Sequence, residues 1–267
     1  MTLDKKQRLV SLAEKVISEP KNIDEINYLL SNLKLTKDEV IEAYVNWDLD
    51  PDIYDNKIYD SLALRFAMYL HYLLPGSWHQ ERQNETIKLL NNYPNSSIVD
   101  LGFGAPQGYV KDVVLNNNYR LSLLDIYDSA LIFSRVLLSY WNSNWEDKIE
   151  LRKYNMDSSE HIGDYDIYLF QDSIEHTKDP TKYLSDLVKK APNNSRFIFS
   201  LPIEGEVVAS GSHFITWRDE NHASQWLDDC GLNVVYSKSI LMNPEVDLFA
   251  DDADYYECLY ECVKNKY

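Results

Sequence analysis

The chain has 267 residues, and 45% of them are hydrophobic, so it can bury the core of one large domain or of one medium domain with an added segment. Acidic residues outnumber basic ones by 43 to 26, which gives a formal charge of −17. A surface this acidic repels phosphate backbones, so the composition argues against nucleic acid as a partner.

Cysteine usage and hydropathy indicate the compartment. The three cysteines, Cys230, Cys258 and Cys262, argue against a disulfide scaffold and in favour of a reducing environment. The six histidines form no H-x-x-H pattern and the cysteines no C-x-x-C pattern, so the sequence predicts no structural zinc and no other metal. The first residues lead into no apolar stretch long enough for a signal peptide or a membrane span, so a cytoplasmic protein without a membrane partner is expected.

Residues 1–90 are predicted to be helical. Apolar residues recur at helical spacing from Leu9 to Ile17 and again over Ile23–Leu33, and Thr36 and Glu39 form the pattern of a capping box. The remainder is predicted to be a loop over Trp47–Asp55, an apolar and aromatic helix over Ile58–Leu74 that ends at Pro75-Gly76, and a helix over His79–Leu90.

From Ser96 onward, strand patterns alternate with helix patterns, which predicts a parallel sheet covered by helices on both faces. No helix separates the last two strands, so they are expected to be antiparallel neighbours. The predicted fold is therefore α/β, a seven-stranded, mostly parallel, doubly wound sheet with an antiparallel last strand, preceded by the helical segment. The expected strands are Ile98–Leu101, Arg120–Asp125, Ile149–Tyr154, Tyr165–Phe170, Arg196–Leu201, Leu232–Ile240 and Tyr255–Val263, and the expected helices are Tyr109–Asn116, Ser129–Trp141, Thr181–Lys190 and Asn221–Cys230.

The stretch Ser97–Gly108 joins the first strand to a glycine-rich turn. Gly102 and Gly104 place no Cβ atom where the backbone approaches a ligand. Pro106 follows two places later, without the third glycine of a dinucleotide loop, and proline offers no N–H to a pyrophosphate. The loop therefore argues against NAD or FAD and favours a nucleoside ligand without phosphates.

A second apolar run, Leu121–Asp125, ends on an acid at about the 20-residue spacing from the glycines that is expected of a nucleoside site. A carboxylate in this position can accept hydrogen bonds from both hydroxyls of a ribose. The ligand is expected at the carboxyl ends of the first strands, where the strand order reverses.

Residues 96–267 resemble the class I (Rossmann-like) S-adenosylmethionine (SAM) dependent methyltransferases, and more narrowly their small-molecule branch. Residues 1–90 resemble no family in this way and are expected to form a helical lid or cap, followed by a SAM-binding domain over 91–267. The matching segments, in the order of the family, are Val99–Gly104, Leu123–Asp125, Tyr154–Asp157, Tyr165–His176, Lys178–Pro180, Ser200–Pro202 and the region of His213, Trp217 and Gly231.

The resemblance implies SAM as the cofactor, with Asp100 near the methionine amine, Asp125 on the ribose, and Asp157 beside the adenine. An ordinary turn or surface role is the alternative for each of these acids. The full set of expected cofactor contacts is Asp100, Gly102, Phe103, Gly104, Asp125, Ile126, Tyr127, Met156, Asp157 and Gln171.

The candidate catalytic residues come after the fourth expected strand. His176 and His213 are candidate general bases, because imidazole titrates near neutral pH, and Asp172 is a candidate substrate contact. In the resembled family the Glu175-His176 pair often organises a loop instead. Arg65, Tyr69 and Trp78 are candidates for a lid over the substrate, with packing of the helices as the alternative.

The function expected from the resemblance is methyl transfer from SAM to oxygen, nitrogen or carbon of a small-molecule substrate. Two alternatives stay open. Loops with proline after the glycines also resemble SAM enzymes that use the aminocarboxypropyl chain and release methylthioadenosine. The chain could also be a non-catalytic binding protein of the same fold. A homodimer is a further option that the sequence leaves open.

Overall fold

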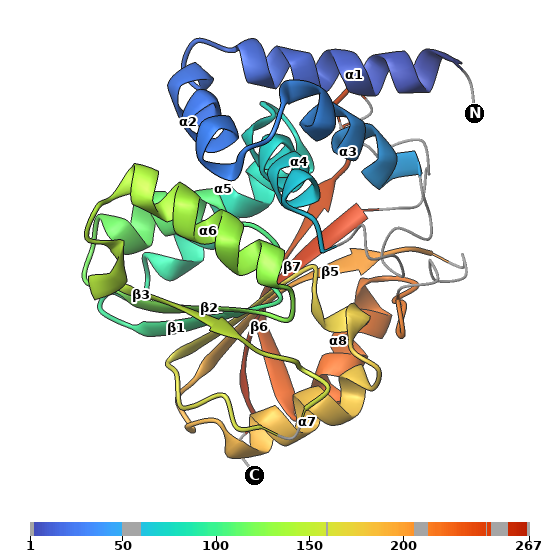
Figure 1. Ribbon diagram of the computed structural model, residues 1–267. Helices are drawn as coiled ribbons and strands as arrows, with labels where there is room; N and C mark the ends of the chain where they lie inside the picture. The colour runs from blue at the N-terminus through green and yellow to red at the C-terminus, as the bar shows by residue number, and fades with distance from the viewer. Residues whose placement is uncertain are drawn as a thin grey trace.

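Seven strands form one sheet at the centre of the protein (Figure 1). The computed structural model describes residues 3–49, 60–158, 160–205, 213–243, 245–246 and 256–265. The strands are β1 (Ser97–Leu101), β2 (Arg120–Asp125), β3 (Ile149–Lys153), β4 (Ile167–Gln171), β5 (Arg196–Ile203), β6 (Leu232–Leu241) and β7 (Tyr256–Lys264).

The strand order is β3-β2-β1-β4-β5-β7-β6. The first five strands in this order are mutually parallel, whereas β7 runs antiparallel to both of its neighbours. The predicted α/β fold, with a mostly parallel sheet and an antiparallel last strand, is confirmed. Because the chain steps from β1 to β2 and β3 on one side and then crosses to β4 on the other, the strand order reverses at the carboxyl ends of β1 and β4, which is where such sheets bind ligands.

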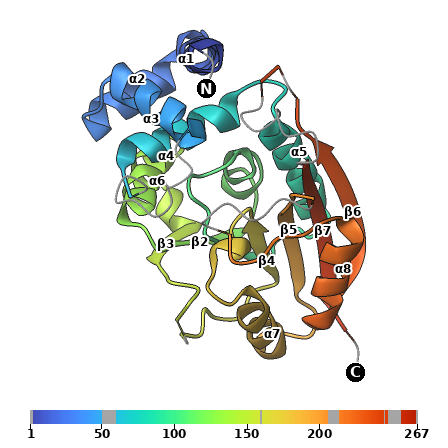
Figure 2. The same cartoon turned by 90° about the vertical axis from the view of Figure 1, so that its right-hand side faces the viewer.

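Helices cover both faces of the sheet, with α5 and α6 on one face and α7 and α8 on the other (Figures 1 and 2). Side chains of a strand alternate between faces, so Ile98 packs in the core under α5 while Val99 and Leu101 pack in the core toward α7 and α8. The helices are α5 (Trp78–Leu90), α6 (Asp128–Trp141), α7 (Pro180–Lys190) and α8 (Glu220–Asp229), with short turns η2 (Val110–Leu115), η3 (Trp145–Asp147) and η4 (Ile174–His176).

Four N-terminal helices form a further layer outside α6, with their own apolar core. Two side chains of α6, Phe133 and Leu137, are buried in this core and join it to the sheet layer. The helix α5, in contrast, packs against the sheet. The N-terminal helices are α1 (Leu3–Ser18), α2 (Ile23–Leu33), α3 (Lys37–Leu49) and α4 (Leu62–Leu73).

A buried carboxylate links the N-terminal layer to α6. Glu25 is 7% exposed and accepts hydrogen bonds from the Tyr69 hydroxyl and from Trp141 Nε1, the latter at 2.9 Å. Lys111 Nζ lies 3.6 Å from the same carboxylate. Since a buried charge is stable only when it is paired and hydrogen-bonded, α2, α4 and α6 are fixed relative to one another at this point.

Local predictions for the helical segment are confirmed in part. The capping box is present, because Glu39 N donates to Thr36 Oγ1 while Thr36 N donates to Glu39 Oε2. The loop predicted over Trp47–Asp55 is wrong at its start, since α3 continues to Leu49 and buries Trp47 against the His71 ring. The helix predicted from Ile58 begins at Leu62 in the described part of the chain, after the N-cap Ser61.

The other predicted elements agree with the structure within a few residues. The helix expected over Tyr109–Asn116 is present as the π-helix η2. The three cysteines are buried and unoxidised, as expected of packing residues. No helix among the described residues combines the length and apolarity needed to cross a membrane.

Replacing Tyr69 by Phe is expected to lower the free energy of unfolding by about 1–3 kcal/mol, because the buried Glu25 carboxylate then lacks one of its donors. Urea denaturation followed by circular dichroism measures this. Tyr28→Phe, on the same helix as Glu25, is the matched control and should change stability by less than about 0.5 kcal/mol. Equal stability of the Tyr69 variant and the wild type would contradict a structural role for Tyr69.

Candidate active site

A pocket opens at the carboxyl ends of β1, β2 and β4, with a cavity volume of about 280 Å³. Its floor comes from the loops that follow these strands. Its roof comes from the helical layers, through Trp47 of α3, Arg65 and Met68 of α4, and Arg82 of α5. The site therefore lies at the position that the strand order predicts.

The glycine loop after β1 forms one wall of the pocket. Gly102 and Gly104 have φ angles of 73° and 64°, a conformation that other residues rarely adopt. A Cβ on Gly102 would lie 2.8 Å from Ser173 Cβ, and one on Gly104 would lie 3.0 Å from Met68 Cε. Gly102 is thus required by backbone conformation and by crowding, and Gly104 chiefly by backbone conformation, since the flexible end of Met68 could shift.

Asp125 stands at the end of β2 and is fixed by the loop. Gly104 N donates to Asp125 Oδ2 at 3.0 Å, and Tyr127 N donates to Oδ1 at 2.9 Å. Each carboxylate oxygen keeps a second lone-pair site, so the group can accept two further hydrogen bonds from a diol. The neighbouring Ile126 is 42% exposed and also lines the pocket, which provides an apolar surface beside this acceptor.

A further part of the wall comes from the loop after β3, where Met156 and Asp157 line the pocket. Lys178 N donates to Asp157 Oδ1 at 2.8 Å, so this loop is joined to the loop that follows β4. Tyr154 also lines the pocket, and its hydroxyl donates a hydrogen bond to the Glu160 carbonyl oxygen. An aromatic ligand ring could therefore lie between two apolar side chains, with a carboxylate at its edge.

Asp100 lies beneath the glycine loop, 1% exposed, and accepts a hydrogen bond from the Tyr109 hydroxyl. Burial raises the pKa of the Asp100 carboxyl to about 7, although the Tyr109 hydrogen bond and the positive charge of Arg82 lower it. The charge of this carboxyl consequently changes near neutral pH, directly under the pocket.

Two buried arginines line the pocket from the helical side. Arg65 is 1% exposed; its Nε donates to Ser129 Oγ at 3.1 Å and its guanidinium stacks over Tyr127 at 4.9 Å. Arg82 is also 1% exposed and stacks over Trp78 at 4.7 Å. Within the described part of the chain, Nε and Nη1 of Arg82 have no hydrogen-bond acceptor. A guanidinium held in this way is suited to bind an anionic group of a ligand.

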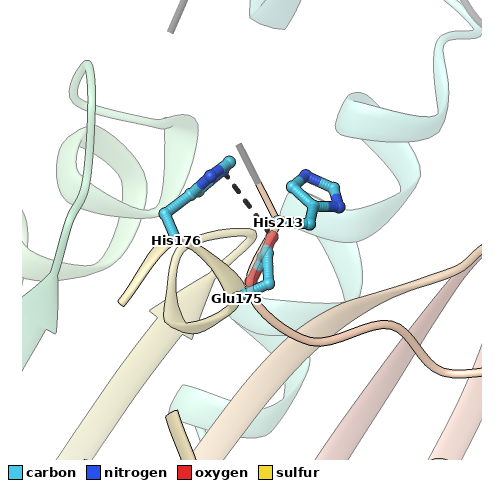
Figure 3. Close-up of side chains that lie close together, drawn as sticks. All are labelled: Glu175, His176 and His213. Carbon is cyan, nitrogen blue, oxygen red and sulfur yellow. Dashed lines mark ion pairs between the residues drawn. The ribbon is translucent and has the colours of Figure 1, made fainter. Parts of the chain in front are cut away.

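Glu175, His176 and His213 lie close together near the end of β4 (Figure 3). Asp172 lines the pocket with a φ angle of 58°, which is strained for a residue with a side chain. Glu175 is fully buried, and this burial, together with the nearby Asp172 carboxyl, raises the pKa of Glu175 well above its usual value. The rings of His176 and His213 are 4.8 Å apart, but only His176 is among the residues that line the pocket.

The pocket brings together most residues that the sequence singled out. Asp100 lies just below its surface, and the other expected cofactor residues line it: Gly102, Phe103, Gly104, Asp125, Ile126, Tyr127, Met156, Asp157 and Gln171. Gln171 is joined to α5 through Thr86 Oγ1 at 3.4 Å.

Only one of the three lid candidates faces the pocket. Arg65 faces the pocket, whereas Tyr69 is buried against Glu25 and Trp78 lies behind Arg82 and His79. His79 itself lines the pocket, and burial lowers its pKa well below the usual value, so its ring is neutral at pH 7. His213, which does not line the pocket, contacts Glu204.

Sequence reasoning missed Trp47, Met68, Arg82 and Phe214, all of which line the pocket. Arg82 had one usable signal. It follows Trp78 by four residues, so on the observed helix α5, which begins at Trp78, both lie on the buried face, where an arginine requires a partner.

Solved structures with this architecture are numerous, although no family model and no curated protein matches the sequence. The [4+2]-cyclase SpnF superposes with a TM-score of 0.57 at 10% identity, over 72% of this chain and 83% of its own. The 1,6-didemethyltoxoflavin-N1-methyltransferase of Burkholderia thailandensis, solved with bound 1,6-didemethyltoxoflavin and S-adenosylhomocysteine, gives a TM-score of 0.52 at 14% identity, over 69% of this chain and 77% of its own.

A third similar structure is the magnesium protoporphyrin IX methyltransferase of Synechocystis PCC 6803 with bound S-adenosylhomocysteine. It has a TM-score of 0.52 at 14% identity, over 70% of this chain and 84% of its own. The chain has the class I methyltransferase fold. At these identities the likeness establishes the fold, and the chemistry has to be argued from the pocket.

Gly102→Ala is expected to destabilise the protein more than Gly231→Ala, although both glycines have positive φ angles, of 73° and 91°. The shared backbone strain costs about 1–2 kcal/mol in each variant. Only Gly102→Ala adds a clash, because the nearest atom to the new Cβ is at 2.8 Å, against 3.5 Å at Gly231. Denaturant unfolding should give a further loss of about 1–3 kcal/mol for Gly102→Ala, and equal losses would contradict the crowding.

Proposed function

We propose that the protein is a SAM-dependent methyltransferase acting on a small molecule. The observation that carries this is the Asp125 carboxylate, held on the glycine loop at the end of β2 with two acceptor sites free for a ribose. The pocket lies where this fold binds its ligand, and two of the structures with the same fold are named methyltransferases. Each was solved with S-adenosylhomocysteine.

In this proposal the ribose of SAM binds to Asp125, and the adenine lies between Ile126 and Met156 with Asp157 at its amino edge. The methionine portion then runs over Gly102 and Gly104, where no Cβ obstructs it. Its ammonium group is directed toward the acidic side of the pocket, above Asp100. Its carboxylate is directed toward the arginines of the helical layer.

The reaction itself requires little covalent help. The methyl carbon of SAM moves from the sulfonium sulfur to the acceptor atom, the sulfur retains the pair of the broken bond, and the acceptor loses a proton to a base or to water. The protein contributes by aligning the three atoms and excluding water. His176 and Asp172 border the pocket beyond the glycine loop, so they are the groups proposed to contact the acceptor.

The N-terminal helices are proposed to act as the lid. Trp47, Arg65 and Met68 from this layer line the pocket opposite the sheet edge, so the substrate would be enclosed between the two layers. SAM has one carboxylate, whereas both Arg65 and Arg82 face the pocket. The second guanidinium is therefore available for an anionic group of the substrate.

A second reaction remains an alternative. The glycine loop carries Pro106, and in this it resembles the loops of SAM enzymes that use the aminocarboxypropyl chain. An attack on that chain releases methylthioadenosine, whereas methyl transfer releases S-adenosylhomocysteine. Incubation of the protein with SAM and pools of small hydroxy acids, phenols and amines, followed by mass spectrometry of the nucleoside products, separates the two. Methylthioadenosine as the enzyme-dependent product would overturn methyl transfer.

Asp125→Ala is expected to weaken SAM binding by at least about tenfold in calorimetry, since it removes the ribose acceptor and releases the loop. Asp128→Ala, three residues away, is the control. Asp128 is exposed and pairs with Lys153 at 2.7 Å on the surface, so its removal should leave the affinity unchanged. Absence of SAM binding by the wild-type protein would support the non-catalytic alternative.

SAM affinity is also expected to depend on the charge of Asp100. Its pKa of about 7 means that the carboxyl is mostly protonated at pH 6 and mostly ionised at pH 8. Affinity for the cationic ligand should therefore rise by up to about tenfold over this range. Asp100→Asn should remove this part of the pH dependence, while titration of the ligand's own amine remains in both proteins. Identical pH profiles would contradict the role of Asp100.

A further inference from the structure

Glu175, His176 and His213 form a cluster of metal-ligand type behind β4 (Figure 3). One ligand atom from each side chain lies within 4.8 Å of the other two. Ligand atoms at about 2.1 Å from a tetrahedral ion lie about 3.4 Å apart, so the three side chains need to close by up to roughly 1.4 Å. The three residues come from two separate segments, the turn η4 and the loop after β5, which the fold brings together.

The Glu175 carboxylate points to a missing ligand. It is fully buried, and no donor among the described residues meets its oxygens with good hydrogen-bond geometry, although the Asp172 side chain lies within hydrogen-bonding reach. Its nearest cationic candidate is His176 Nε2, at 4.0 Å from Oε1. A buried carboxylate without donors is costly, and coordination to a cation is one of the two ways in which proteins satisfy such a group.

The surroundings of Glu175 add further negative charge. Asp172 and the buried Glu257 lie close enough to act on its carboxyl electrostatically. Asp172 is also held at a φ angle of 58°, a strained backbone conformation of the kind that clusters at ligand and metal sites. A cation beside Glu175 would offset this negative charge.

Glu204 supports His213 in the way that an outer carboxylate supports a metal-bound histidine. Its Oε1 lies 2.9 Å from His213 Nδ1, and both side chains are about nine-tenths buried. The contact lacks hydrogen-bond geometry, so it places a carboxylate beside Nδ1 of the ring without fixing the tautomer. The arrangement is thus a carboxylate–histidine pair directed at the cluster.

We propose that Glu175, His176 and His213 bind one divalent first-row transition-metal ion or Zn²⁺, with Asp172 next to it on the pocket side. Two imidazoles and a carboxylate favour such ions over Mg²⁺ or Ca²⁺, and three protein ligands leave coordination positions open. His176 lines the pocket, so an open position is directed toward the substrate.

This inference rests on the proposed function and names the acceptor. An ion in this position lowers the pKa of a hydroxyl that coordinates to it, so the substrate would be a hydroxyl compound that is methylated on oxygen. The O–H proton leaves to Asp172 or water, the oxygen forms the new bond to the methyl carbon, and the carbon–sulfur bond of SAM breaks. No oxidation or reduction is involved.

Titration of the metal-free protein with Co²⁺, without SAM or substrate, tests the site through the visible absorption spectrum of the bound ion. The expected result is one tightly bound ion per chain, displaced by Zn²⁺. His213→Ala and Glu175→Gln should each weaken Co²⁺ binding at least tenfold. His161→Ala should leave it unchanged, because His161 is a half-exposed histidine paired with Asp164 outside the cluster.

Glu175→Gln preserves the shape of the side chain, so it remains informative if His213→Ala does not fold. No spectral change with Co²⁺, or binding that persists in Glu175→Gln but is lost in His161→Ala, would overturn the proposal. SAM binding is measured separately by calorimetry. A protein that binds SAM but not Co²⁺ would refute the metal site alone, and one that binds Co²⁺ but not SAM would support the metal site while refuting the methyltransferase function.

Discussion

The hydrogen bonds around Asp125 are the constraint on which the pocket depends. Gly104 N binds one oxygen of its carboxylate, and Gly102 N donates to the Leu124 carbonyl at 2.8 Å, so the glycine loop is fixed to the neighbouring strand by both side chain and main chain. The loop cannot move without breaking contacts at the end of β2. The ligand surface is therefore formed before a ligand arrives, which reduces the ordering cost of binding.

The pocket also separates charge, although the protein as a whole is strongly acidic. Its arginines come from the helical layer, through α4 and α5, whereas its acids come from the strand ends. A zwitterion placed between the two layers has one preferred direction, since its anionic end is drawn to one layer and its cationic end to the other. Binding and orientation thus follow from the way the layers are stacked.

The sheet and the cofactor side of the pocket were predictable because they depend on local patterns. Three features carried the prediction: strand periodicity, the glycines at positive φ, and the acid that ends β2. Each of them can be recognised from a few neighbouring residues. Arg82 and the metal-type cluster were not predicted, because their meaning depends on packing between distant segments. Glu175 and His213 are separated by a strand and a helix crossover, and only the position of the loop after β5 makes them neighbours. Tyr69 was assigned to a lid because an aromatic on an apolar helix looks the same whether it faces a cavity or a buried carboxylate.

The position of β7 has a consequence for how the protein is made. This strand follows β6 in the sequence, yet it lies between β5 and β6, and in the described structure β6 pairs with no other strand. Until β7 has left the ribosome, β5 remains an open, apolar edge and β6 has no place in the sheet. Synthesis therefore passes through a stage in which the strands already made expose an edge that is prone to aggregation.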